Sequence, residues 1–266
     1  MKMMVSRLKK DMVVLSGLVI LVIHSSFINV SGGRMAGSFF AATGEARIIA
    51  EFLSLTNPFF NGWETHSFYV DKKTVYDSLK LDIAGLNREA FEYGLKGLDR
   101  LIQEGRTEKQ QILSIIDFSQ PSYKKRLYVI DLDNYSLLFQ TWVAHGRNSG
   151  GEMANTFSNK PASYKSSLGF YLTGNTYRGK HGYSLKLEGL EKGINDNALR
   201  RAIVMHGADY VNESLANSQG YIGRSQGCPA ISKTLYRPII DHIKEGSCLF
   251  IYHPSERYLQ SSPLLN

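Results

Sequence analysis

The chain has 266 residues, of which 43% are hydrophobic and 21% are charged. These proportions exclude global disorder, and the length suits one large domain or two small ones. The formal charge of +7 includes a net +4 from residues 1–34, so the remaining chain carries only +3 and lacks the concentrated basic face of a nucleic-acid-binding protein. We therefore expect no nucleic-acid partner.

The first 34 residues have the character of a targeting segment. A basic start that ends at Lys9 and Lys10 precedes residues 12–23, which carry no charge. Twelve apolar-biased residues behind a basic start are typical of a secretory signal, and they are short for a spanning helix. We expect export to the periplasm or cell envelope. A membrane anchor is the alternative if residues 1–34 are not cleaved.

Residues 35–109 are predicted to form a helical N-terminal region. Asn87 can cap a helix whose apolar residues recur every three or four positions as far as Ile102, and Gly105 stands where a C′ glycine would end it. Residues 75–86 indicate a second, shorter helix. We expect this region to pack against the rest of the chain and to carry no chemistry.

The pattern changes to a β type in residues 110–254. Short apolar runs alternate with glycine-bearing turns, and Asp133-Asn134 suits a hairpin turn. A helix near Pro238 interrupts the strands, and residues 255–266 read as a C-terminal tail. The sequence predicts a mainly β domain with added helices, a sandwich or a barrel. The expected strands are residues 112–118, 127–131, 137–144, 170–173, 183–188, 202–205 and 248–252. Gly174, Gly179 and Gly182 are expected in a loop after residue 173.

A cysteine and a histidine form the strongest candidate site. The strand ending near residue 207 is predicted to present His206 at its exposed end, and Cys228 lies in a glycine-bearing loop. A thiol becomes a good nucleophile near neutral pH when a base or a positive field helps it to ionise. Pro229 suits the first position of a helix, which would place Cys228 near a helix N-terminus, where the dipole favours a thiolate.

The loop around Cys228 also suits an oxyanion hole. Gly227 lets the backbone turn tightly, so amides from Gln226 to Cys228 can point at one spot. The structural alternative is an ordinary loop with a buried cysteine. A second alternative is a disulfide between Cys228 and Cys248, which export would permit. Cys248 lies in an apolar run typical of a buried strand, and this setting argues against the disulfide.

Other histidines and known motifs add little. His145 and His181 each precede a glycine and could approach the cleft from a neighbouring loop, although a turn histidine without a catalytic task is the simpler interpretation. The sequence has no metal-ligand spacing and no glycine-rich nucleotide loop. We therefore expect no metal and no cofactor.

Two further patterns carry a family resemblance. His206-Gly207 followed by Ser225-Gln-Gly-Cys228 resembles the signature of the L,D-transpeptidase (YkuD-like) catalytic domain. Residues 166–171, 179–185 and 223–230 are similar to its divergent second branch, the murein L,D-transpeptidase catalytic domain family. The resemblance covers about residues 110–254. It implies a β-sandwich-like cysteine acyltransferase that attacks the L,D-peptide bond of a peptidoglycan tetrapeptide stem, releases D-alanine and transfers the acyl group to an amine.

The resemblance also implies roles for residues. Cys228 matches the acyl-accepting thiol, and His206 matches the base that later protonates the leaving amine. Gly207 matches the carbonyl that orients this imidazole. Ser225 and Gly227 shape the loop.

Four further residues are candidate members of the site. Gln226 stands where the family has a histidine, which leaves substrate choice open. Arg224 suits a substrate carboxylate because its guanidinium can pair with two oxygens, but it could equally be a solvated surface residue. Tyr171 and Tyr183 could line a substrate groove, although aromatic residues in strands more often belong to a core.

Two other functions stay open at this point. Water could resolve the same acyl-enzyme, which would make the protein an L,D-carboxypeptidase or endopeptidase. The domain could also be a non-catalytic module that binds the cell wall. Peptidoglycan stem peptides are the expected partner in each enzyme, and the sequence does not specify an oligomeric state.

Overall fold

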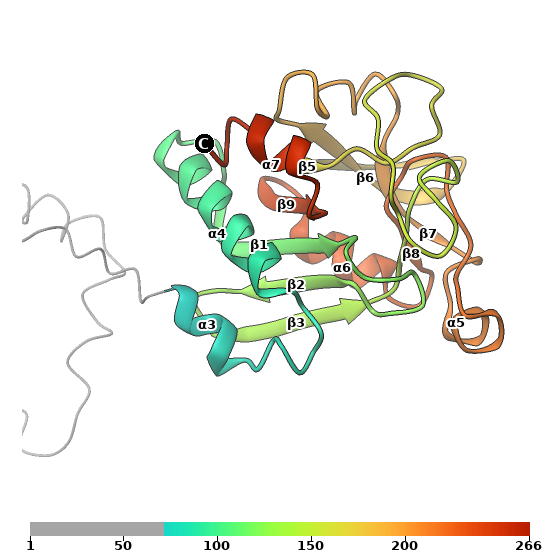
Figure 1. Cartoon of the computed structure of the whole chain (residues 1–266), viewed down its shortest axis with the longest axis horizontal. Helices are drawn as coiled ribbons and strands as arrows, with labels where there is room; N and C mark the ends of the chain where they lie inside the picture. The colour runs from blue at the N-terminus through green and yellow to red at the C-terminus, as the bar shows by residue number, and fades with distance from the viewer. Residues whose placement is uncertain (1–71) are drawn as a thin grey trace, which may run out of the picture. The chain divides into compact units, whose positions relative to one another are not determined.

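The computed structural model describes residues 72–266. The predicted targeting segment, residues 1–34, and residues 35–71 of the predicted helical region lie outside them. Figure 1 shows the described helices and strands. The helices are α3 (Lys72–Ser78), α4 (Arg88–Gln103), α5 (Glu213–Gln219), α6 (Tyr236–Ile243) and α7 (Glu256–Ser261). The strands are β1 (Lys109–Asp117), β2 (Leu127–Asp131), β3 (Ser136–Thr141), β4 (Val143–Ala144), β5 (Gly169–Gly179), β6 (Gly182–Gly189), β7 (Val204–Ala208), β8 (Ala230–Ser232) and β9 (Ser247–Tyr252).

The helix predicted after Asn87 is confirmed as α4. The Asn87 side chain accepts a hydrogen bond of 2.8 Å from the amide of Glu89, which satisfies a donor that the first turn leaves free. At the other end Gly105 has a φ of +64°, and its amide donates to the carbonyl of Ile102. This is the C′ glycine that the sequence predicts. The helix lies close against the sheet, since a Cβ on Gly97 would lie 2.1 Å from the ring of Phe170.

The shorter helix is only partly confirmed. α3 ends at Ser78, and the chain continues in turns as far as residue 85. None of the described helices combines the length and the apolar character that crossing a membrane would require. The predicted division between residues 109 and 110 stays a prediction.

The described strands form one nine-stranded sheet with the order β3-β2-β1-β9-β5-β6-β7-β8-β4. Its two edge strands, β3 and β4, are consecutive in the chain and are separated only by Trp142. The sheet must therefore curl until its edges approach each other, as in a nearly closed barrel. The predicted mainly β fold is confirmed, whereas the single strand predicted at 137–144 is wrong. It is divided between the two edges because Val143 pairs with Ile231 of β8.

Two predictions about glycine and proline are also wrong. Gly174 was expected in a loop, but it lies inside the long strand β5, where the register with β6 shifts between Thr173 and Thr176. Pro229 does not begin a helix, because the next residues form β8 between β7 and β4. The helix predicted near Pro238 is confirmed as α6.

The C-terminal residues pack against the domain through a buried carboxylate. The carboxylate of Glu191 accepts a hydrogen bond of 2.7 Å from the amide of Phe170 and one of 3.2 Å from the hydroxyl of Tyr258 on α7. The hydroxyl of Ser262 donates to the same carboxylate. Burial raises the pKa of Glu191, while these donors oppose the rise. Residues 255–266 are thus part of the packed domain.

Candidate active site

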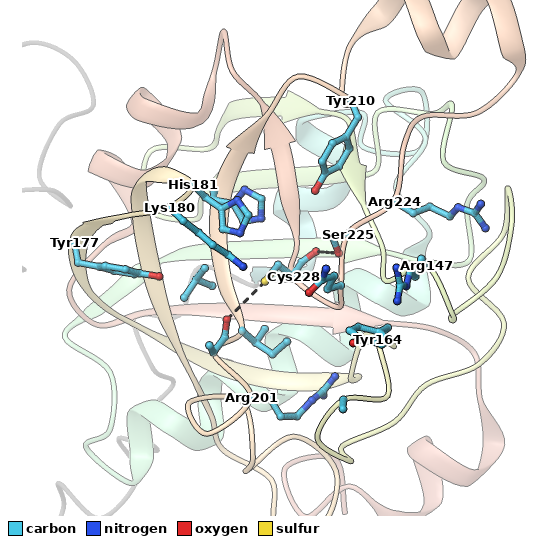
Figure 2. A pocket seen from close by; sticks show the side chains of 16 residues that line it. Arg147, Tyr164, Tyr177, Lys180, His181, Arg201, Tyr210, Arg224, Ser225 and Cys228 are labelled. Atoms are coloured by element: carbon cyan, nitrogen blue, oxygen red, sulfur yellow. Dashed lines mark hydrogen bonds between the residues drawn. The ribbon is translucent and has the colours of Figure 1, made fainter.

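A cavity of about 410 Å³ lies beside the turn of the β5–β6 hairpin, strand β7 and the loop before β8. Cys228 and His206 both line it, although they are separated by twenty-two positions in the chain. Ser225, Gln226 and Arg224 line the same cavity. The structure therefore brings the predicted nucleophile, the predicted base and part of the loop between them to one place. Figure 2 shows Cys228, Ser225 and Arg224 in this cavity.

His206 reaches the cavity from the middle of β7. It pairs with Ser184 of β6 on one side and with Ala230 of β8 on the other. The expectation of an exposed strand end is wrong, because only 2% of His206 is exposed. Side chains alternate along a strand, so a side chain at position 207 would lie on the opposite face of the sheet from His206. A Cβ on Gly207 would lie 2.8 Å from the ring of Tyr236, on the face that α6 covers.

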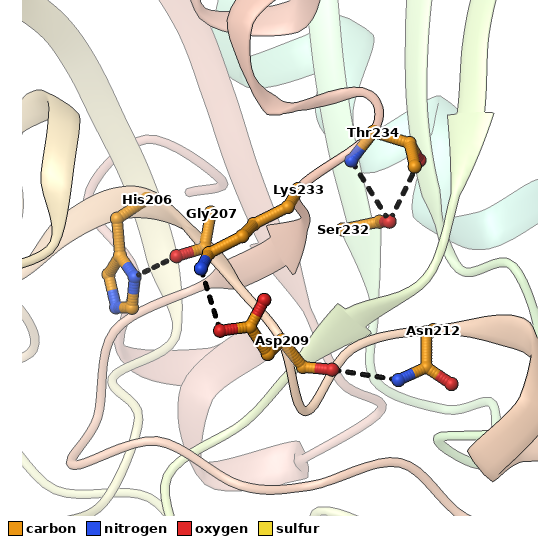
Figure 3. A network of polar contacts seen from close by, with 7 residues as sticks. All are labelled: His206, Gly207, Asp209, Asn212, Ser232, Lys233 and Thr234. Carbon is orange, nitrogen blue, oxygen red and sulfur yellow. Dashed lines mark hydrogen bonds and ion pairs between the residues drawn. The ribbon is translucent and has the colours of Figure 1, made fainter.

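A backbone carbonyl determines the tautomer of His206. Nδ1 of its ring lies 3.0 Å from the carbonyl oxygen of Gly207 (Figure 3). A carbonyl can only accept, so Nδ1 carries the proton and Nε2 keeps a free lone pair. Burial lowers the pKa of His206, with a smaller lowering from nearby His181 and Lys180. The imidazole is therefore neutral at pH 7 and able to act as a base.

The loop that holds Cys228 is tied together by Ser225. The Ser225 hydroxyl donates a hydrogen bond of 2.6 Å to the carbonyl of Cys228 and accepts one of 3.0 Å from the amide of Gly227. Gly227 has a φ of +120°, a conformation that disfavours any residue with a side chain. The loop-shaping roles expected for Ser225 and Gly227 agree with these contacts.

The Cys228 thiol is protonated in the resting site. Its Sγ lies 3.7 Å from the carbonyl oxygen of Ala202, to which the thiol donates (Figure 2). Among the described residues no hydrogen bond joins it to an imidazole. Burial raises the pKa of Cys228, and the amide of Val204 and the positive charges of Arg201 and Lys180 oppose the rise. The predicted help from a helix dipole is absent here because Pro229 leads into a strand.

The second cysteine is not a partner for the first. Cys228 and Cys248 are both free, and Cys248 is buried inside β9. Burial raises the pKa of Cys248 far above its usual range. The disulfide alternative is therefore excluded in this structure, and Cys248 behaves as a small core residue.

The backbone amides near the thiol are available only in part. The Gly227 amide is used within the loop, because it donates to Ser225. In the part of the chain that the structure describes, the amides of Gln226 and Cys228 donate to no other residue. These two groups are the donors left for an oxyanion.

The cavity wall is strongly basic. Four cations line it and no aspartate or glutamate does. Within residues 72–266 none of the four makes an ion pair with a carboxylate. Such a wall favours an anionic ligand. The cations are Arg147, Lys180, Arg201 and Arg224.

Arg201 has a second task that the sequence did not indicate. Its guanidinium donates to the carbonyls of Ser158 at 2.8 Å and Lys165 at 2.5 Å, and also to the hydroxyls of Ser163 and Ser167. The carbonyl of Lys165 in turn would lie 2.8 Å from a Cβ on Gly227. Arg201 therefore holds the loop of residues 158–167 against the Cys228 loop.

The three predicted substrate contacts lie in different places. Arg224 lines the cavity with an exposed side chain, and its guanidinium donates a hydrogen bond of 3.0 Å to the carbonyl of Gly150. Tyr171 is buried in the core, where its hydroxyl donates a hydrogen bond to the carbonyl of Ser167. The Tyr183 hydroxyl donates a hydrogen bond of 2.5 Å to the carboxylate of Asp241 on α6. Neither tyrosine lines the cavity, so the structure does not support their predicted role.

Other residues also reach the cavity. Of the two histidines that could approach the cleft from a neighbouring loop, His181 lines the cavity and His145 does not. Lys180 and His181 form the turn between β5 and β6, and Tyr210 points its hydroxyl into the cavity (Figure 2). Burial raises the pKa of Tyr210 to about 12, so this hydroxyl is a donor at neutral pH. Gly179 and Gly182, which were expected in a loop, flank this turn, but nothing local in the sequence places it over His206. No group of three or more potential metal ligands occurs in the described residues.

Comparisons with known proteins agree with the family resemblance. The family model described as L,D-transpeptidase catalytic domain matches residues 82–252, more than half of the chain. A search of the curated proteins found no significant match.

Solved structures with a similar fold include three that share 12 to 15% of their residues with this chain. An L,D-transpeptidase from Mycobacterium smegmatis is 13% identical with a TM-score of 0.33, and the match covers 54% of this chain and 59% of that one. An L,D-transpeptidase from Xylanimonas cellulosilytica is 15% identical with a TM-score of 0.30, covering 52% and 59%. The helical cell shape determining protein Pgp2 from Campylobacter jejuni is 12% identical with a TM-score of 0.37, covering 64% and 59%.

This chain thus spans about 59% of the length of each of these solved chains, and at such identities and TM-scores the likeness carries no argument about function. The family match stands on its own, since it covers the sheet from β1 to β9 and the loop that holds Cys228. The chain belongs to the L,D-transpeptidase catalytic domain family.

Proposed function

We propose that the protein is an exported peptidoglycan L,D-transpeptidase that works through a thioacyl intermediate on Cys228. The observation that carries the proposal is the shared cavity, which is lined both by Cys228 and by a neutral His206 whose Nε2 is free. A free thiol that shares a cavity with a neutral imidazole meets the requirement of thiol-dependent acyl transfer for a nucleophile and a base.

The first half of the reaction forms the acyl-enzyme. Nε2 of His206 takes the thiol proton, and the sulfur attacks the carbonyl carbon of the L,D-peptide bond. The amides of Gln226 and Cys228 donate to the oxygen that becomes negative, and each well-placed donor is worth roughly 2.7–4 kcal/mol. The intermediate then collapses, the C–N bond breaks, and the His206 imidazolium gives its proton to the amine of the departing D-alanine.

The second half repeats these roles with an amine. His206, neutral again, takes a proton from the acceptor amine as its nitrogen attacks the thioester carbonyl. The C–S bond breaks, the thiolate recovers its proton from His206, and a new amide cross-link leaves the site. The 3.7 Å contact between the resting thiol and Ala202 must give way before the first step. Catalytic hydrogen bonds are often loose before substrate binds, so this adjustment is ordinary.

The charge of the cavity supports the substrate class. A peptidoglycan stem carries carboxylates, and the wall formed by Arg147, Lys180, Arg201 and Arg224 offers them cations without competing acids. Arg147 also stacks over the ring of Tyr164 at 4.1 Å, which steadies one side of this wall.

The test is mass spectrometry of purified tetrapeptide muropeptides after incubation with the full chain. We expect cross-linked products that lack one D-alanine, and we expect Cys228→Ala and His206→Asn to abolish them. Cys248→Ala is the matched control because it removes the other thiol, which is buried outside the cavity. That variant should retain turnover.

Other outcomes assign one of the competing functions. Trimmed monomers without cross-links would mean that water resolves the acyl-enzyme, as in an L,D-carboxypeptidase or endopeptidase. Unchanged muropeptides with the intact chain, together with retained binding to cell walls, would replace the proposal with a non-catalytic wall-binding module.

A further inference from the structure

A second imidazole lies directly on the proposed base. The rings of His181 and His206 stack with centroids 4.2 Å apart and an angle of 17° between their planes. His181 comes from the exposed turn between β5 and β6, and Ser184 of β6 pairs with His206 in the sheet. The sheet register therefore carries the turn over the ring of His206.

The stack supplies a constraint that the other contact of His206 cannot supply. The bond from Nδ1 to the Gly207 carbonyl fixes one edge of the ring but leaves it free to tilt about that bond. A parallel ring against one face removes this freedom, because tilting would break the contact or overlap the atoms. Together the two contacts fix both the edge and the plane of the imidazole.

We infer that His181 is a positioning residue, which holds the His206 ring so that Nε2 faces the thiol through each turnover. The inference rests on the proposed function, since it assigns His206 as the base. His181 acts through His206, and its own nitrogens take no part in the bonds that form or break.

The charged surroundings of the pair give the inference a measurable signature. Lys180 shares the turn with His181, Cys228 comes from the loop before β8, and Arg201 comes from the segment before β7. Burial is the main cause that lowers the pKa of both histidines, and Lys180 lowers both further. A positive charge on His181 lowers the pKa of His206 as well, so removing His181 should be visible in the titration of His206.

The direct test is an NMR titration of the His206 imidazole in the full chain, with the signal assigned by its loss in His206→Asn. In the intact chain the midpoint should lie below 6.5. His181→Ala uncovers the ring and removes a charged neighbour, so the midpoint should rise. His181→Phe keeps a stacked ring without its charge, so its midpoint should lie between those two. The His145 signal, whose pKa burial lowers to about 4, is the internal reference and should not move.

Kinetics on tetrapeptide muropeptides give the second measurement. His181→Ala should lower kcat by roughly tenfold or more with little change in KM, because the base loses its alignment. His181→Phe should restore most of kcat, since the stack is the part that matters. Arg178→Ala is the matched control on the same hairpin, exposed and outside the cavity, and it should behave as the intact chain does.

The outcomes separate this inference from the proposed function. An unchanged His206 midpoint in His181→Ala overturns the inference, and so does a loss of kcat in His181→Phe as large as in His181→Ala. If the intact chain has no turnover that depends on Cys228, the proposed function fails, and the NMR midpoints still decide whether His181 controls His206.

Discussion

The Ser225 hydroxyl donates a 2.6 Å hydrogen bond to the carbonyl oxygen of Cys228, the residue whose thiol we propose as the nucleophile. The same hydroxyl accepts from the amide of Gly227, so one side chain closes the turn from both directions. Only 5% of Ser225 is exposed, and water therefore cannot easily replace either bond. The position of the thiol and of the two free amides depends on this side chain.

Ser225→Ala should damage both the fold and the reaction. Two buried hydrogen bonds are lost at about 1 kcal/mol each, so the free energy of unfolding should fall by about 2 kcal/mol. We expect kcat to fall by about tenfold or more, because the loop can no longer hold the thiol and the amides together. Urea unfolding and muropeptide turnover measure the two effects. Ser214→Ala, on the exposed face of α5, is the control and should alter neither.

The Cys228 thiol should react slowly with iodoacetamide when no substrate is bound. Burial raises the pKa of Cys228, so at pH 7 the thiolate fraction is smaller than in a free cysteine. Lys180→Ala should slow the reaction further, because Lys180 is one of the charges that oppose the rise. Intact-mass spectrometry over time gives the rate. A rate above that of free cysteine would contradict the raised pKa and would indicate a thiolate already formed in the resting site.

The elements predictable from the sequence are those that local interactions define. The cap at Asn87, the glycine at 105 and the spacing of apolar residues between them are all within one helix, and α4 matches the prediction. The same holds for β2 and β3 around the Asp133-Asn134 turn. In each case the signals lie within a few residues of the structure that they determine.

The parts that escaped prediction depend on contacts between distant segments. Pro229 would suit a helix by itself, but pairing of the following residues with β7 and β4 outweighs that local preference. The stack of His181 on His206 follows from the register of β6 with β7, which no local pattern specifies. The residues alone suggested the pairing of Cys228 with His206, and the family resemblance added the peptidoglycan chemistry. The structure added the raised pKa of the thiol, which neither had indicated.

A buried histidine should make the protein sensitive to acid. His145 is fully buried, its Nδ1 lies 2.8 Å from the guanidinium of Arg126, and its pKa is lowered from 6.5 to about 4. The unfolded chain therefore binds this proton more readily than the folded one. Neutral His145 thus contributes about 3 kcal/mol to the free energy of unfolding above pH 6.5. This contribution is lost as the pH falls from 6.5 to about 4.

Urea unfolding at several pH values measures this loss. His145→Gln cannot take up the proton, so its stability should fall less steeply over the same range, even if it is lower at pH 7. Equal slopes for the two proteins would show that His145 is not the group responsible. His145 also matters to the candidate site, because its carbonyl accepts a hydrogen bond of 2.9 Å from the amide of Ser225.

The last twelve residues should be required for a stable domain. Tyr258, Leu264 and Leu265 are each less than 5% exposed, and burial of such side chains contributes roughly 1.5–3 kcal/mol apiece. A chain that stops after Pro254 would also deprive the buried Glu191 carboxylate of the Tyr258 and Ser262 hydroxyls. We expect a loss of about 5 kcal/mol or more in the free energy of unfolding. Thermal unfolding checks this, with Arg257→Ala on the exposed side of α7 as the control. If the shortened chain unfolds at the same temperature as the intact one, residues 255–266 are a dispensable tail after all.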